Sequence, residues 1–327
     1  MPRPVELRFR AGDLALAGEL LLPDAAPASG RHPWVLLLPS FGPRDRDGAW
    51  DRAGHPAWFA VTDADADAPS GLLARLAHAL AAAGVASFRH DPRGCGASEG
   101  SWESADLFSR IDDARDAVAA MRARDELDLR RSGLLAHGEG ALLAMSVAIG
   151  DPVLSALTLV GAPARSMRDV LRRGAAERAR RGVETQHPFV AALDRGLEEL
   201  IERADRHEAS VELRIADAGV RIGLAGWRQA FDTPGIALAT MLRRSVTLVH
   251  GERDAWVDPA ESALLAATLR EAGGDPLVRH IPGSGHDLAE ADDATLALIA
   301  DDLAGRLVPR DLPPVLLALE TEPPATR

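Results

Sequence analysis

The stretch Ser132-Gly-Leu-Leu-Ala-His-Gly-Glu-Gly-Ala-Leu-Leu-Ala144 decides the fold, because a short apolar run passes directly into a helical pattern. The small residues Ala136 and Gly140 allow a strand and a helix to pass each other closely. Gly138 stands between them, and glycine adopts a positive φ at no steric cost. The stretch therefore predicts a buried strand that turns sharply into a helix.

The rest of the chain repeats this order of strand and helix. Short continuous apolar runs, as expected of strands buried on both faces, alternate with amphipathic segments. The runs are residues 34–38, 85–88, 133–136, 156–160, 246–249 and 277–281. The amphipathic segments are residues 72–83, 105–124, 141–149, 260–272 and 294–307. With an opening hairpin over 5–10 and 14–22, the alternation predicts an α/β fold whose mostly parallel central sheet has helices on both faces.

Residues 165–243 break this rhythm, since their periodicity is helical and no clear strand is visible. We interpret them as a helical cap inserted into a core of residues 1–164 and 244–310, with a proline-rich C-terminal tail over 311–327. The first part of the cap is strongly basic, and this run is either a solvated helix face or a patch that attracts acidic ligands. Its basic residues are Arg165, Arg168, Arg172, Arg173, Arg178, Arg180 and Arg181.

Composition excludes several classes of protein. The 327 residues are 46% apolar and 26% charged, which suits one sizeable globular core. The net charge of -12 repels nucleic acid and anionic membranes, so neither is expected as a partner. Cys95 is the single cysteine, and no Cys/His cluster has the spacing of a metal site. The first ten residues lack the apolar region of a secretory signal, and no apolar run reaches the roughly 18 residues of a membrane span. These features predict a cytoplasmic protein without metal or cofactor.

A strand, turn and helix of the pattern G-x-S-x-G present a nucleophilic serine to a cleft. Residues 136–140 read Ala-His-Gly-Glu-Gly, which puts Gly138 at the nucleophile position. A dinucleotide-binding turn is the competing interpretation, because Gly138-x-Gly140 also opens a helix. It is disfavoured because Leu143 stands where a third small residue belongs and no acidic residue ends the next strand.

Two later residues support the first interpretation. Asp254 follows the strand over 246–249, and His286 follows the strand over 277–281. An order of nucleophile, acid and histidine, with the last two after late strands, is typical of hydrolytic triads on such a layered sheet. In that arrangement Asp254 holds the imidazole of His286 in one tautomer and stabilises its charged form.

The loop that follows the strand over 34–38 is where one amide of an oxyanion hole is expected. We assign this donor to the backbone N–H of Phe41 and the second to that of Glu139, the residue after the turn. Trp50, Trp58 and Phe59 come soon after this loop. They either line the mouth of the cleft, where they contact substrate, or pack the loop itself.

Three motifs make the chain resemble the bacterial esterase branch of the α/β hydrolase superfamily, whose patterns are G-x-G-P-x-D-R-D-G, D-x-R-G-x-G-x-S and G-H-S-x-G. Here they read Phe41-Gly-Pro-Arg-Asp-Arg-Asp-Gly48, Asp91-Pro-Arg-Gly-Cys-Gly-Ala-Ser98 and Ala136-His-Gly-Glu-Gly140. The resemblance covers about residues 33–164 and 245–306. It implies an α/β-hydrolase fold and a carboxylic-ester hydrolase-like protein for a small-molecule acyl substrate.

The resemblance also implies catalytic positions at Gly138, Asp254 and His286, with glycine in place of the serine of the pattern. Ser98 lies in a second match to G-x-S-x-G, but no apolar helix follows it. Cys95 is in the same turn and is expected to be a small structural residue.

Three hypotheses for function follow. In the first, weak or altered chemistry depends on the histidine and the acid, and a water molecule takes the vacated hydroxyl position at Gly138. In the second, the chain is an inactive pseudo-hydrolase that binds a ligand or a partner. In the third, the glycine is a deliberate replacement of the serine of an active esterase. The substrate is set by the cap and the cleft loops, where the resemblance is weakest.

Overall fold

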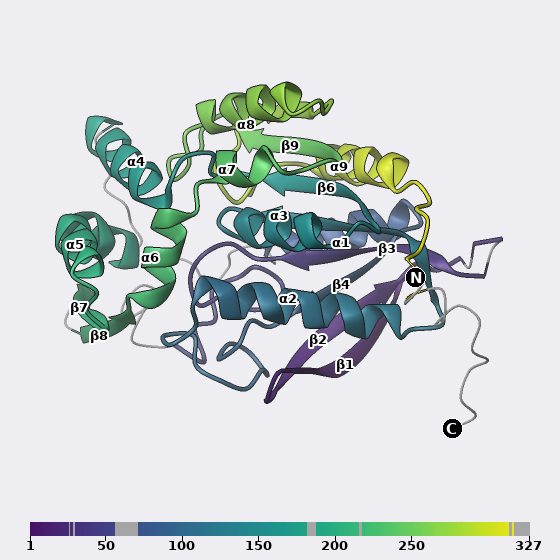
Figure 1. The fold of residues 1–327 in the computed structure, drawn as a ribbon, viewed down its shortest axis with the longest axis horizontal. Helices are drawn as coiled ribbons and strands as arrows, with labels where there is room; N and C mark the ends of the chain where they lie inside the picture. Colours follow the sequence, from purple (N-terminus) through teal and green to yellow (C-terminus); the bar gives the residue numbers. More distant parts are fainter. Residues whose placement is uncertain are drawn as a thin grey trace.

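An eight-stranded sheet runs through the computed structural model, which describes residues 1–25, 27–28, 30–55, 71–181, 188–215, 218–313 and 316 (Figure 1). Across the sheet the strands are β1 (Arg3–Ala11), β2 (Leu14–Leu22), β4 (Ala86–His90), β3 (His32–Leu38), β5 (Leu127–His137), β6 (Leu154–Val160), β9 (Ser245–Gly251) and β10 (Leu277–Ile281). β2 pairs antiparallel with both β1 and β4, and the strands from β4 to β10 are parallel. The predicted mostly parallel sheet is thus confirmed.

Burial along the strands explains why these residues form them. β3 and β6 are buried along their whole length, as their continuous apolar runs predict. β1 lies at the edge of the sheet, and its exposed residues alternate with half-buried or buried ones. Gly12 has a φ of 56° and makes the tight turn of the predicted opening hairpin.

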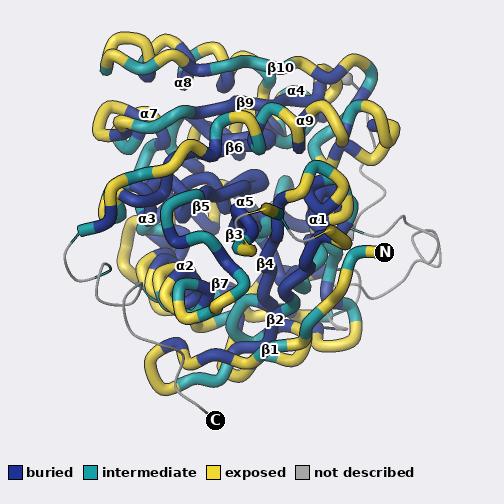
Figure 2. Tube along the Cα trace, turned by 90° about the vertical axis from the view of Figure 1, so that its right-hand side faces the viewer, coloured by how far each residue is buried: buried dark blue, intermediate teal, exposed yellow. Residues whose placement is uncertain are grey.

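Helices cover both faces of the sheet. α1 (Leu72–Ala82) and α9 (Asp293–Arg306) pack on one face, and α2 (Leu107–Arg122), α3 (Gly140–Gly150) and α8 (Ala260–Glu271) pack on the other. Figure 2 shows the buried strands inside these layers and the exposed outer sides of the helices. The helix bounds agree with the predicted segments to within two residues. In the described part of the chain, every helix falls short of the length or the apolar content that a membrane crossing requires.

The inserted segment over residues 165–243 is not helical throughout, which corrects the prediction. Its elements are α4 (Met167–Arg181), α5 (Pro188–Asp205), the antiparallel hairpin of β7 (Ser210–Ile215) and β8 (Ala218–Gly223), α6 (Ala225–Asp232) and α7 (Gly235–Ala239). Val211, Leu213 and Ile215 are buried and alternate with exposed polar residues. This period of two is typical of a strand, but each run has only six residues and stands between helical segments. Figure 1 shows α4, α5, α6 and the hairpin of β7 and β8 at the left, beyond the ends of the sheet strands.

The basic run at the start of the cap forms ion pairs with acidic residues of α5. These pairs are Arg168 with Asp205, Arg172 with Glu198, and Arg178 with Asp194. Arg165, just before α4, pairs instead with the buried carboxylate of Glu261 in α8. The positive charge of these residues is therefore compensated within the fold. The ion pairs hold α4 against α5 and α8.

Candidate active site

The bend after β5 places Gly138 at the carboxyl end of the central strands. Gly138 has a φ of 54°, and its N–H donates a hydrogen bond to Val160 O at 2.8 Å. A Cβ on Gly140 would lie 3.0 Å from Leu38 O and still closer to the next carbonyl, so only glycine lets α3 pass the end of β3. The sharp turn expected from the sequence is present.

Asp254 and His286 meet across the loops that follow β9 and β10. Nδ1 of His286 lies 2.7 Å from Oδ2 of Asp254, while Oδ1 accepts the N–H groups of Trp256 and Val257 at 2.8 and 2.9 Å. Nε2 of His250 also lies 3.2 Å from Oδ2. The carboxylate is therefore fixed, and it favours the His286 tautomer whose proton is on Nδ1. Nε2 is then left to accept a proton.

The charges of this pair favour an ionised acid beside a basic imidazole. Burial raises the pKa of Asp254, but the charge of His286 and the hydrogen bonds from both histidines outweigh it, so the pKa lies below its ordinary 3.8. Burial lowers the pKa of His286, but the charge and hydrogen bond of Asp254 raise it above 6.5. His286 is thus set up to take a proton in the way of a general base.

The imidazole of His286 faces the bend at Gly138. A Cβ built on Gly138 would lie 3.1 Å from Nε2 of His286. Gly161, with a φ of 56° after β6, makes room for the ring, because a Cβ there would lie 3.1 Å from both Nδ1 and Cε1. The structure thus brings together Gly138, Asp254 and His286, the three positions named from the sequence.

The space beside Gly138 holds a side chain that the sequence motifs did not reveal. A Cβ on Gly138 would overlap Oγ of Ser40 and lie 2.9 Å from its Cβ. The Ser40 hydroxyl therefore lies beside the vacated position, and the water molecule expected there stays a hypothesis. Ser40 follows β3, the strand that pairs with β5, and this pairing was the information needed to find it.

His137 supports His286 from behind the bend. Its Nε2–H donates a hydrogen bond to the backbone carbonyl of His286 at 3.0 Å, and the centres of the two rings lie 4.4 Å apart. Burial and the charge of His286 lower the pKa of His137 to about 3, so this ring is neutral at pH 7. It therefore holds the loop that carries His286 without competing for a proton.

A largely apolar pocket lies over the bend. Ser40, Gly138 and His286 are in its wall. Large apolar side chains from the core and the cap form much of the rest: Trp50, Met167, Val170, Leu171, Trp227 and Trp256. Trp50 lines the pocket, and its contact with substrate stays a prediction, whereas Trp58 and Phe59 lie outside the described residues.

The loop that carries Phe41 is held on two sides. The Phe41 ring packs edge to face on Trp227, with 4.5 Å between the ring centres. Arg44 is buried, donates to Phe41 O at 3.2 Å and to Gly48 O at 2.6 Å, and lies 4.2 Å over the ring of Trp50. The backbone at Phe41 is therefore fixed at the pocket wall, as an oxyanion-hole donor requires.

Glu139 is the residue before the first turn of α3, where backbone N–H groups have no partner within the helix. Its carboxylate forms an ion pair with Arg110 at 2.8 Å, so the side chain is held by α2, and Glu139 is among the residues that line the pocket. The assignment of the Phe41 and Glu139 amides to an oxyanion hole stays a prediction.

The first two sequence motifs meet in a buried ion pair that fastens this loop. The guanidinium of Arg46 donates to both carboxylate oxygens of Asp91, at 3.2 and 2.8 Å, and its backbone N–H donates to Oδ1 at 2.8 Å. Ser98 donates to Asp91 O at 2.6 Å and accepts the N–H of Ala17 at 2.9 Å. Ser98 thus belongs to the support of the loop.

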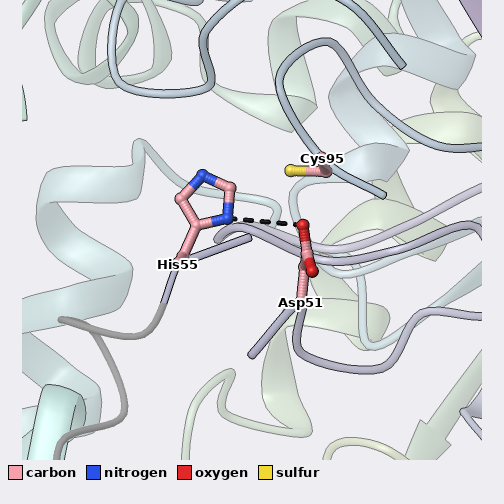
Figure 3. A group of neighbouring side chains, drawn as sticks. All are labelled: Asp51, His55 and Cys95. Carbon is pink, nitrogen blue, oxygen red and sulfur yellow. Dashed lines mark ion pairs between the residues drawn. The ribbon is translucent and has the colours of Figure 1, made fainter. Parts of the chain in front are cut away.

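Figure 3 shows a second cluster, in which Asp51, His55 and Cys95 bring their donor atoms within 4.8 Å of one another. Oδ2 of Asp51 lies 3.4 Å from Nδ1 of His55 and accepts the N–H of Gly96 at 2.8 Å. Burial, followed by the nearby carboxylates, raises the pKa of the Cys95 thiol, which is therefore protonated at neutral pH. These are donor types that zinc uses, but we interpret the cluster as a contact that ties the loop of Asp51 to the turn after β4. A further group of ligand-type residues among those described is His137, His286 and Asp287.

A carboxylate and an imidazole, carried by loops after two late strands, meet here at a bend from strand into helix on a mostly parallel sheet. This combination defines an α/β-hydrolase-fold protein. The chain belongs to the serine aminopeptidase S33 family, whose family model matches residues 68–293. No curated protein matches the chain.

Solved structures of low sequence identity share the fold. Est1E from Butyrivibrio proteoclasticus, with ferulic acid bound, is 17% identical with a TM-score of 0.61, over 91% of this chain and 96% of its own. GrgF, an α/β hydrolase from Penicillium sp. sh18, is 19% identical with a TM-score of 0.58, over 94% and 99%. DcsB in complex with its substrate analogue is 15% identical with a TM-score of 0.62, over 94% and 100%. At these identities the likeness shows the fold alone.

Proposed function

We propose that the protein hydrolyses carboxylic esters of small molecules at the pocket over Gly138. The observation that carries this proposal is the pair of Asp254 and His286, whose free nitrogen Nε2 points at the bend and into an apolar pocket. Within such a pocket an ion pair and its hydrogen bonds act more strongly than in water.

His286 is the general base of this reaction. Its Nε2 removes the proton from the hydroxyl group that attacks the ester carbonyl carbon, while Asp254 stabilises the imidazolium that forms. The same proton is then given to the leaving alcohol. The N–H groups of Phe41 and Glu139 stabilise the negative charge on the substrate oxygen.

The pocket wall favours an apolar or aromatic acyl group of small to medium size. Trp50, Trp227 and Trp256 offer flat apolar surfaces, and the cap adds aliphatic side chains from α4. The bound ferulic acid of Est1E shows that a protein of this fold accommodates an aromatic acid. We therefore propose aryl-substituted and medium-chain acyl esters as first substrates.

Absence of a side chain at Gly138 favours a second candidate, an inactive pseudo-hydrolase that binds a ligand in this pocket. The third possibility is an active esterase whose serine at position 138 was replaced. A serine Cβ at 138 would displace the Ser40 hydroxyl, which turns about a single side-chain bond.

A series of p-nitrophenyl and methyl cinnamate-type esters tests the proposal. We expect slow, saturable hydrolysis by the unmodified chain and a loss of about 10² to 10⁴ in kcat/KM for His286→Ala. His280→Ala is the matched control, because His280 is an exposed histidine of β10, the strand that precedes His286 in the chain. If the chain binds the free acid but turns over no ester, and His286→Ala binds the acid equally well, the protein is a pseudo-hydrolase instead.

A further inference from the structure

We propose that Ser40 supplies the nucleophile that is missing from the nucleophile elbow, the turn from β5 into α3 at Gly138. This inference rests on the proposed esterase function and identifies its attacking group. It would make the protein a serine hydrolase whose serine sits at the end of β3 and not at the end of β5.

The placement of Ser40 follows from strand register. β3 and β5 are parallel neighbours in which Leu38 is paired with Ala136. Ser40 and Gly138 each stand two residues beyond this pair, so they occupy equivalent places past the ends of adjacent strands. At the bend these two positions come together, since a Cβ on Gly138 would overlap the Ser40 hydroxyl.

The Ser40 hydroxyl shares this space with the free nitrogen of His286. The position of a Cβ on Gly138 lies in contact with Ser40 Oγ and 3.1 Å from Nε2 of His286. A rotation about one side-chain bond of serine moves Oγ over a few ångströms, and catalytic hydrogen bonds in free enzymes are often long before substrate binds. The hydroxyl thus lies within reach of a base whose other nitrogen is held by Asp254.

Other candidates for the attacking group are poorly placed. Among the described residues that line the pocket, Ser40 alone carries a hydroxyl or a thiol. Ser98 is engaged with Asp91 and Ala17, and Cys95 is buried with a raised pKa. The loop motif also agrees, since the pattern G-x-G-P-x-D-R-D-G begins with a glycine where this chain has Ser40. The chain thus has serine where the loop pattern has glycine, and glycine where the elbow pattern has serine.

The chemical steps balance with the groups present. Oγ of Ser40 bonds to the acyl carbon, its proton passes to Nε2 of His286, and the ester C–O bond breaks as the alcohol takes that proton. A water molecule then attacks the acyl-Ser40 ester and gives a proton to His286, and Ser40 regains it as the acid leaves. Phe41 follows Ser40 and Glu139 follows Gly138, so the exchange leaves both predicted oxyanion donors beside the reaction.

A fluorophosphonate probe tests the assignment directly. Such a probe forms a P–O bond with an activated serine and loses fluoride, and peptide mapping then locates the modified residue. We expect modification at Ser40 in the unmodified chain, none in Ser40→Ala, and a strong decrease in His286→Ala. Ser101→Ala, which removes an exposed hydroxyl, is the matched control and should be modified like the unmodified chain. Unchanged thermal unfolding of Ser40→Ala shows that the variant is folded.

Ester turnover separates this inference from the function on which it rests. We expect Ser40→Ala to lose at least about 100-fold in kcat/KM together with any acyl-enzyme burst. If Ser40→Ala keeps its turnover while His286→Ala loses it, the esterase function stands and the Ser40 assignment is wrong. If no ester is turned over, the proposed function fails, and probe modification at Ser40 still decides whether this serine is an activated nucleophile.

Discussion

Gly138 and Ser40 should be coupled in stability, because the side chain of one occupies the Cβ position of the other. We consider the single variants Gly138→Ala and Ser40→Gly and the double variant. Gly138→Ala adds a Cβ that overlaps the Ser40 hydroxyl, whereas in the Ser40→Gly background the remaining close neighbour is Nε2 of His286, at 3.1 Å. The expected result is that Gly138→Ala is far better tolerated after Ser40→Gly.

The magnitude has two parts. Alanine at a φ of 54° costs about 1–2 kcal/mol, because the left-handed region is unfavourable for residues with a Cβ. Forcing one extra carbon into occupied space costs about 1–3 kcal/mol more. Gly138→Ala should therefore lower the free energy of unfolding by about 2–5 kcal/mol alone, but by only about 1–2 kcal/mol with Ser40→Gly present. The coupling free energy of the cycle is then about 1–3 kcal/mol.

Urea unfolding, followed by tryptophan fluorescence and circular dichroism, measures these differences. Gly12→Ala supplies the backbone cost alone, because Gly12 has nearly the same φ, 56°, and a Cβ there would meet no atom within 4 Å. The reasoning is refuted if Gly138→Ala costs no more than Gly12→Ala. It is equally refuted if Ser40→Gly brings no relief to Gly138→Ala.

Three further outcomes follow from charge and burial. Because Asp254 raises the pKa of His286, and the base must be unprotonated, kcat/KM for esters should rise with pH through a midpoint above 6.5 in a pH profile. Cys95 should not react with Ellman's reagent at pH 8 until the chain is unfolded in urea, because it is buried and its thiol pKa is raised. Arg46→Ala should lower the free energy of unfolding by about 3–5 kcal/mol in the same urea titration, since it removes the cation that pairs with the buried carboxylate of Asp91. Arg115→Ala, in an exposed pair, should cost less than about 1 kcal/mol.

The core of the fold could be predicted because its periodic signals are long and agree with one another. The strand over residues 277–281 and the helices on both faces were expected within two residues of their observed bounds. The cap hairpin was missed for the opposite reason. Its strands have six residues each, and the alternation of Val211, Leu213 and Ile215 is short enough to be taken for part of a helical segment.

Asp254 and His286 could be placed from sequence because each follows a strand whose end lies at the same edge of the sheet. Parallel strands bring all such ends together whatever their exact register. The pairing of Arg46 with Asp91 could not be placed in this way. It joins two loops whose relative position depends on side-chain contacts and not on a repeating pattern.

Ser40 shows most clearly what a one-dimensional pattern leaves out. The elbow motif covers only residues at the end of β5. The space beside the imidazole, however, is bounded by the ends of two adjacent strands, β3 and β5. Register decides which residue of each strand faces that space, and here it sets Ser40 against Gly138. In the proposed arrangement, a hydroxyl supplied from either strand end reaches the same base and lies beside the amide of the following residue. Loss of the elbow serine is therefore weak evidence for an inactive site unless the neighbouring strand end is also examined.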